Sequence, residues 1–178
     1  VHVFQSALFQ TNTTVLETAD MILVVDPNWL PIEIAQIRKY TVLASRKFGE
    51  GVSKATSKPV WLLFTHSDYD HIIGYHAFSD MVAGVIASRA FVENLGQVAI
   101  LEQIKQFDDE YYISRDYPIV YPSVSHIVEH DGQVLEIGQT QLTFFNAQGH
   151  NPDGIFTVVN QTFIAGDYLC DVEFPYIY

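Results

Sequence analysis

Residues 60–71 read VWLLFTHSDYDH, and this stretch decides the fold. Its first five residues form a continuous apolar run, which is typical of a β-strand that is covered on both faces. Thr65 ends the run, and a polar cluster follows at once. A buried strand that leads directly into a helix indicates a layered α/β arrangement, with the polar cluster at the end of the strand.

Apolar patterning elsewhere predicts alternating short strands and helices. Upstream, we expect a meander of three strands at residues 3–9, 13–17 and 21–25, then a helix from Pro31 to the glycines at 49 and 51. Downstream, we expect a short helix at 71–78, a buried strand at 82–86 and a longer helix from Ser88. After His126, short strands are predicted at 127–129, 133–137, 142–145, 155–159 and 162–165. The stretch 108–121, rich in Asp and Tyr, is interpreted as a surface excursion.

Length and composition predict a single domain over residues 1–178. Hydrophobic residues make up 48% and charged residues 17%, which excludes disorder, and the apolar stretches are too short to span a bilayer. A net charge of −12 repels phosphate backbones and anionic membranes. We therefore expect no nucleic-acid partner and no membrane partner, but a small-molecule substrate.

Cysteine usage and the start of the chain bear on its location. The only cysteine, Cys170, excludes an internal disulfide framework and is interpreted as a small buried thiol. No signal-peptide pattern opens the sequence, which favours a cytoplasmic location. Because the sequence begins at Val1 without Met, a removed secretory leader stays open as an alternative.

The polar cluster after the strand has the composition of a metal site. In an extended turn alternate side chains point the same way, so His66, Asp68 and Asp70 would share one side, and His71 would open the helix beside them. Imidazole and carboxylate together suit Zn²⁺, Fe²⁺ or Mn²⁺. Four polar groups at the end of a buried strand are hard to explain by structure alone, so we interpret them as ligands.

This run resembles the signature of the metallo-β-lactamase superfamily, whose usual form is His-x-His-x-Asp-His after a buried strand. Residues 148–152, QGHNP, are similar to the Gly-His turn of that family, and residues 164–167, IAGD, to its strand-ending Gly-Asp. The order and approximate spacing match over nearly the whole chain. The resemblance implies an α/β fold, the four-layer αβ/βα sandwich, with a metal centre at one edge of the paired sheets.

The resemblance also implies a role for each ligand of two divalent metal ions. The first ion would be held by His66, Asp68 and His150, and the second by Asp70 and His71, with Asp167 bridging. Zinc is the expected metal, with manganese and iron as alternatives. The implied function is that of a metal-dependent hydrolase in which a metal-bound hydroxide attacks an ester, lactone, thioester, amide or phosphodiester bond. Asp70 would be the catalytic proton acceptor.

Two features depart from the family pattern. Asp68 stands where the commonest form has His, and an oxygen ligand shifts the preference toward harder metals. On the sequence alone, Asp68→His is predicted to be tolerated and to raise zinc affinity. The family also supplies a last second-site His downstream, but residues 168–178 contain none. The chain is therefore interpreted as C-terminally truncated or as a variant with a weak second site.

These departures leave alternatives open. A carboxylate at position 68 is known in the diiron branch of the family, so a diiron protein acting on oxygen or nitric oxide is one alternative, and a non-catalytic metal-binding fragment is another. A truncated chain would end in an exposed apolar edge, made by Val172, Phe174, Tyr176 and Tyr178, through which it would self-associate. The tyrosines of 111–121 are interpreted as a surface loop, with a wall of the substrate pocket as the second interpretation.

Overall fold

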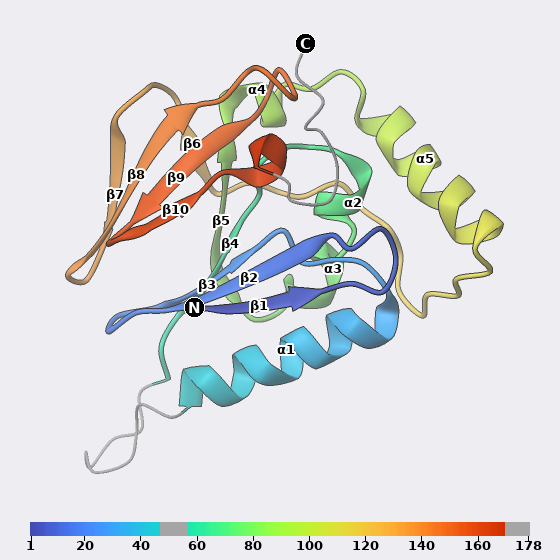
Figure 1. Cartoon of the computed structure of the whole chain (residues 1–178), viewed down its shortest axis with the longest axis horizontal. Coiled ribbons are helices and arrows are strands. Elements are labelled where there is room, and N and C mark those ends of the chain that lie inside the picture. Colours follow the sequence, from blue (N-terminus) through green and yellow to red (C-terminus); the bar gives the residue numbers. More distant parts are fainter. Residues whose placement is uncertain (47–56, 170–178) are drawn as a thin grey trace.

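The computed structural model describes residues 1–46 and 57–169. Two β-sheets and a group of helices make up this part of the chain (Figure 1). The six-stranded sheet has the order β1 (His2–Gln5), β2 (Asn12–Glu17), β3 (Ile22–Val25), β4 (Val60–Leu63), β5 (Val82–Ser88) and β6 (His126–Val128). The four-stranded sheet has the order β10 (Thr162–Ile164), β9 (Ile155–Val159), β8 (Thr140–Asn146) and β7 (Gln133–Ile137).

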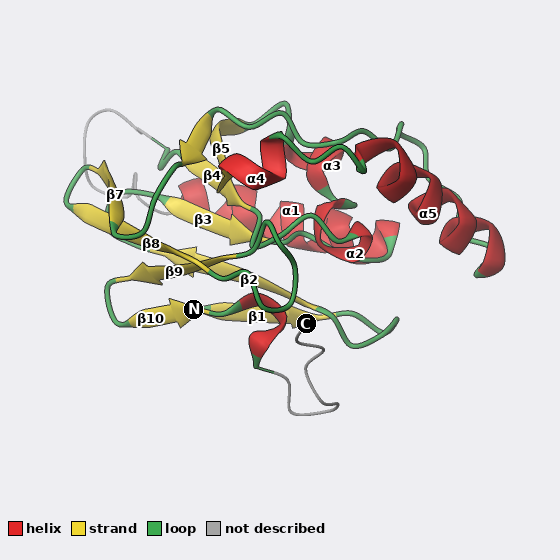
Figure 2. Ribbon diagram, turned by 90° about the horizontal axis from the view of Figure 1, so that it is seen from above, coloured by secondary structure: helices red, strands yellow, loops and turns green. Residues whose placement is uncertain are grey.

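The helices and the two sheets form layers. The α-helices are α1 (Pro31–Arg46), α2 (Tyr69–Ile72), α3 (Tyr75–Phe78), α4 (Arg89–Val92) and α5 (Gln97–Glu110), and a short 3₁₀ helix, η2, covers Gly166–Tyr168. The α-helices cover one face of the six-stranded sheet, and the four-stranded sheet covers the other (Figure 2). The predicted α/β sandwich is confirmed as a fold class, and three of its four expected layers lie within residues 1–46 and 57–169.

Strand direction brings several strand ends to one edge. The predicted meander is confirmed, because β1, β2 and β3 pair antiparallel. From β3 to β6 the pairing is parallel, which requires crossover connections, and these carry the helices. The carboxyl ends of β3, β4 and β5 therefore lie along the same edge of the sheet, and residues that follow these strands become neighbours.

The central strands are buried on both faces, as the apolar run predicts. In β3 and β4, Val24 and Leu62 join the core beneath the helices, whereas Leu23 and Leu63 join the core between the sheets. All four are fully buried. Each alternate position thus faces a different apolar layer, which is why these strands read as continuous apolar runs.

Several predicted boundaries are wrong, and local contacts explain why. The first strand stops at Gln5, because Ser6 N–H bonds to Thr11 O and closes the hairpin early. The helix expected at 71–78 is two short helices, of which α2 begins at Tyr69. The helix expected from Ser88 is also divided, because Asn94 Oδ1 accepts the Gly96 N–H between α4 and α5.

The stretch 108–121 lies at the surface, as predicted, but a buried contact fixes it. Asp108 belongs to the last turn of α5 and is buried. Its carboxylate pairs with both Nε and Nη2 of Arg115, at 2.7 and 2.9 Å, and Arg115 Nη1 also donates to Trp29 O at 3.2 Å. A buried ion pair therefore fixes this segment to the loop that precedes α1.

Some expectations concern residues outside the described ranges. These are the glycine stop of the first helix, the burial of Cys170 and the apolar edge at 172–178. Within residues 1–46 and 57–169, no helix has the length and apolar character needed to cross a bilayer.

Candidate metal centre

The candidate centre lies where the two sheets meet at one edge. His66, Asp68, Asp70 and His71 follow β4, whereas His150 lies between β8 and β9 and Asp167 follows β10. The Ile155 N–H of β9 donates to Thr65 O at 2.8 Å, so the ends of β4 and β9 are joined by the backbone. The structure thus brings all six predicted ligands to one region.

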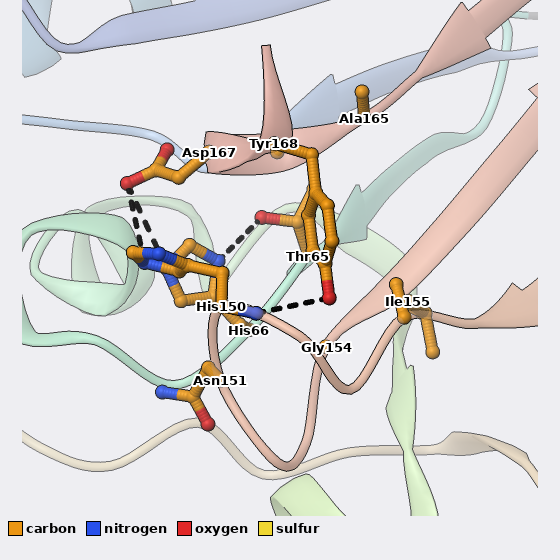
Figure 3. A pocket seen from close by; sticks show the side chains of 11 residues that line it. Thr65, His66, His150, Asn151, Gly154, Ile155, Ala165, Asp167 and Tyr168 are labelled. Carbon is orange, nitrogen blue, oxygen red and sulfur yellow. Dashed lines mark hydrogen bonds and ion pairs between the residues drawn. The ribbon is translucent and has the colours of Figure 1, made fainter. Parts of the chain in front are cut away.

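A first group consists of four atoms that could bind a metal: Nε2 of His66 and His150 and Oδ2 of Asp68 and Asp167. Asp68 Oδ2 lies 3.3 Å from Nε2 of both His66 and His150. Asp167 Oδ2 lies 3.6 Å from His150 Nε2 and 4.0 Å from His66 Nε2. Ligand atoms about 2.0–2.1 Å from a tetrahedral zinc ion stand roughly 3.3 Å apart, so these separations suit such an ion. Figure 3 shows His66, His150 and Asp167 pointing toward one another.

A second group adjoins the first through Asp167. His71 Nε2 lies 3.2 Å from Asp167 Oδ1 and 3.7 Å from Asp70 Oδ2. Asp167 thus presents Oδ2 to the first group and Oδ1 to the second. The groups are close enough that donor atoms of His66, His71 and Asp167 also lie within 4.8 Å of one another.

The local backbone differs from the expected extended turn. His66 and Asp68 do approach each other, but Asp70 lies in α2, where alternate residues do not share a side. Asp68 is the residue that precedes α2, and His71 is its third residue rather than its first. Asp70 therefore reaches the centre beside His71 and not beside His66.

Two ring nitrogens at the centre carry the strongest sign of a ligand. The Nε2 atoms of His66 and His71 are buried and make no hydrogen bond within the described part of the chain. A buried polar atom without a partner costs free energy, and native proteins rarely tolerate it. Both atoms face carboxylate oxygens, and a divalent cation between these nitrogens and oxygens would satisfy all of them. The residues present therefore fit a metal ion.

Neighbouring charges shift the pKa values of Asp68, Asp167 and His71. Burial would raise the pKa of Asp68, but the nearby imidazoles, His66 first, lower it to about 2. The pKa of Asp167 is also lowered, mainly by His71 against the effect of burial. Burial would lower the pKa of His71, yet its acidic neighbours, Asp70 first, raise it well above the ordinary value. The centre therefore attracts positive charge.

Asp26 is a residue of the centre to which the sequence analysis gives no role. Its Oδ1 accepts the Thr65 N–H at 2.9 Å, and its Oδ2 accepts the Thr65 hydroxyl at 2.6 Å and lies 2.9 Å from His71 Nδ1. Because the Thr65 hydroxyl donates to Asp26, it accepts from His66 Nδ1, 3.0 Å away. Both imidazoles therefore carry a proton on Nδ1, and Nε2 faces the centre. A signal for this role was present, because Asp26 directly follows a buried strand that neighbours β4.

We expect Asp26→Ala to weaken metal binding by about 10- to 100-fold, the usual loss when a partner that orients a ligand is removed. Both His66 and His71 would lose the interaction that fixes their ring orientation. The measurement is a chelator competition with zinc. Asp20→Ala is the control, since Asp20 bonds Gln139 and Thr140 at the remote end of the sheets. An equal loss in both variants would contradict the assignment.

The Gly-His turn and the Gly-Asp turn hold each other in place. The Tyr168 hydroxyl oxygen accepts the backbone N–H of Gly149 and that of His150, the latter at 2.9 Å. Gly166 has a φ of +55°, and a Cβ there would lie 3.0 Å from Thr65 Oγ1. Only glycine combines this conformation with such a close approach. These contacts set His150 and Asp167 beside His66, as Figure 3 shows.

The pocket drawn in Figure 3 is lined by residues of these turns and not by the Tyr-rich stretch. Its walls come from Thr65, His66, Ala147, His150, Asn151, Gly154, Ile155, Ala165, Gly166, Asp167 and Tyr168. Tyr121 instead donates to Phe91 O, and Tyr111 stacks against Phe107. The tyrosines of 111–121 do not line this pocket. Tyr69 stacks on Phe107 with ring centroids 4.7 Å apart.

Comparison with solved structures identifies the fold. No protein-family model matches the sequence, and no curated protein matches it. Among solved structures, the BLEG-1 B3 metallo-β-lactamase aligns with a TM-score of 0.65 at 15% identity, over 96% of this chain and 73% of that one. The chain has the metallo-β-lactamase fold. TTHA1623 in a di-iron-bound form aligns with a TM-score of 0.64 at 15% identity, over 98% of this chain and 75% of that one.

The metallo-β-lactamase fold is also shared with ETHE1 from Myxococcus xanthus. The alignment has a TM-score of 0.57 at 14% identity and covers 95% of this chain. It covers 57% of that chain, so this sequence spans little more than half the length of that relative. At such identities the likeness describes the fold, and the chemistry must be argued from the side chains.

Proposed function

We propose that this metallo-β-lactamase-fold chain is a metal-dependent hydrolase of a small-molecule substrate. One observation carries the proposal: the two oxygens of Asp167 face two different groups of metal-ligand side chains. His66, Asp68 and His150 would hold one divalent ion, Asp70 and His71 the other, and Asp167 would lie between them. When bound, a pair of such ions lowers the pKa of water and polarises the bond to be cleaved.

The side chains around the centre suit hydrolysis. Asp70 lies beside His71 at the second proposed ion site, 3.7 Å from its Nε2, where it could accept a proton from the attacking water. Asp26 and Thr65 keep His66 and His71 in one ring orientation. The net charge of −12 disfavours polyanionic substrates. We therefore expect an ester, lactone, thioester, amide or small phosphodiester, rather than a nucleic acid, as the substrate, and we propose zinc as the metal.

A second candidate function is diiron redox chemistry with oxygen or nitric oxide. The carboxylate of Asp68 supports it, because its Oδ2 faces both His66 and His150 and oxygen ligands suit iron. A solved structure with the same fold is described in a di-iron-bound form. Manganese is compatible with the same donor set.

Metal analysis combined with turnover separates these candidates. The chain is purified without chelators, its metal content is measured by mass spectrometry, and it is assayed with zinc, manganese or iron against esters, lactones, thioesters, amides and phosphodiesters. Zinc or manganese together with turnover of one bond class supports hydrolysis. Iron together with oxygen or nitric oxide consumption supports the second candidate. Stoichiometric metal without either activity would indicate a non-catalytic metal-binding fragment and contradict both.

A further inference from the structure

Asn151 contacts the residue by which this chain departs from the usual motif. Its Nδ2 donates a hydrogen bond to Asp68 Oδ1 at 2.7 Å. The other oxygen, Oδ2, lies 3.3 Å from Nε2 of both His66 and His150. The two oxygens of the Asp68 carboxylate therefore have separate tasks: one is held by the amide, and the other faces the imidazoles.

The orientation of the Asn151 amide is determined by its other contact. Its Oδ1 accepts the Asp153 backbone N–H at 3.2 Å. A backbone N–H is always a donor, so the oxygen must lie on that side and the NH₂ group must face Asp68. Asp153 is itself fixed, because its carboxylate accepts from Ser67 N at 3.0 Å and from Asn94 Nδ2 at 3.2 Å. The amide cannot turn over without losing both of its hydrogen bonds.

From this geometry we propose that Asn151 is the positioning residue that selects a carboxylate at position 68 and presents a single oxygen of it to the metal. The inference rests on the ligand assignment made under the proposed function. A His at position 68 that binds a metal through one ring nitrogen carries a proton on the other. That N–H would meet the NH₂ group of Asn151, so two donors would face each other without an acceptor. The Asn151 NH₂ group, a hydrogen-bond donor, is therefore matched to a carboxylate acceptor at position 68 and not to an imidazole N–H.

The proposal reverses the expectation drawn from the sequence alone for Asp68→His. Restoring the commoner ligand should weaken zinc binding at least 10-fold, because the new ring has no partner to orient it and partners of this kind are worth about 10- to 100-fold in affinity. Asn151→Asp should weaken binding as well, since two carboxylates would then stand at the 2.7 Å contact. Combining the two changes should restore affinity, because the new carboxylate accepts the imidazole N–H.

The test is a double-mutant cycle in the full chain, with zinc affinity as the first readout and the spectrum of the Co²⁺-loaded proteins as the second. Zinc affinity is measured by chelator competition for the unaltered chain, Asp68→His, Asn151→Asp and the double variant. We expect the double variant to bind zinc at least 10-fold more tightly than Asp68→His does. Asp68→His combined with Asn151→Ala, which removes the opposing donor without adding charge, should also exceed Asp68→His. The visible spectrum of the Co²⁺-loaded proteins should show the same pattern, because it reports ligand type and geometry.

Two controls separate the possible failures. Asn146→Ala changes an exposed side chain that lines a neighbouring cavity, and it should leave zinc affinity unaltered. His66→Ala tests the metal centre itself. If His66→Ala abolishes binding while neither double variant exceeds Asp68→His, the inference about Asn151 is overturned and the proposed function stands. If His66→Ala binds zinc like the unaltered chain, the proposed function fails and this inference fails with it.

Discussion

His66→Ala is expected to lower zinc affinity by more than about 100-fold and to abolish hydrolysis. The loss of an orienting partner alone costs about 10- to 100-fold, and His66 is proposed as a direct ligand. Its Nε2 is buried, faces Asp68 and Asp167, and makes no hydrogen bond within residues 1–46 and 57–169. Native mass spectrometry for metal content, together with chelator competition, measures the effect.

The matched control for this prediction is His130→Ala. His130 is exposed, and its Nδ1 lies 3.1 Å from the carbonyl oxygen of the neighbouring Asp131. Its removal should leave both metal content and turnover unaltered. His150→Ala should behave like His66→Ala, since both imidazoles face the same Asp68 oxygen. Full metal content in both His66→Ala and His150→Ala would refute the ligand assignment.

Arg115→Ala is expected to lower the free energy of unfolding by about 3–5 kcal/mol, the usual cost of breaking a buried ion pair from one side. Only 3% of the Arg115 side chain is exposed, and 10% of that of Asp108. The substitution leaves the Asp108 carboxylate buried without its cation and removes the bond to Trp29 O. Urea-induced unfolding followed by tryptophan fluorescence measures the loss.

Two comparisons distinguish this cost from a general effect of removing arginine. Arg89 also pairs with a carboxylate, Glu129, but both side chains are close to half exposed, so Arg89→Ala should leave the urea midpoint nearly unchanged. The double variant Arg115→Met with Asp108→Leu leaves no isolated charge and should be more stable than Arg115→Ala. A double variant as unstable as Arg115→Ala would show that the charge is not the cause.

The apolar patterning predicts the layers well because a strand that is buried on both faces consists almost entirely of apolar residues. Strands β3 and β4 could be recognised in this way, and the polar cluster after β4 could be recognised as a candidate metal site from residue types alone. The motif order also predicts that His150 and Asp167 lie near this cluster. Nothing in the local pattern, however, indicates which oxygen of Asp167 faces which imidazole, since that depends on how the two sheets meet.

What the sequence does not reveal are contacts between residues far apart in the chain. Asp26 bonds a threonine and a histidine that lie 39 and 45 residues downstream. Arg115 donates to Trp29 O across 86 residues, a contact that fixes the Tyr-rich surface stretch and that no local pattern indicates. Such pairings follow from the three-dimensional path of the chain and not from periodicity.

The position of Asp26 also links the two halves of the centre. The same carboxylate reaches His66 through the Thr65 hydroxyl and His71 directly, at one imidazole of each proposed ion site. An ion that fixes either ring therefore also fixes the side chain that orients the other ring. Part of the conformational entropy lost on loading the second site has then already been lost on loading the first. The affinities of the two sites should accordingly be coupled through Asp26, so that loading the first ion raises the affinity for the second.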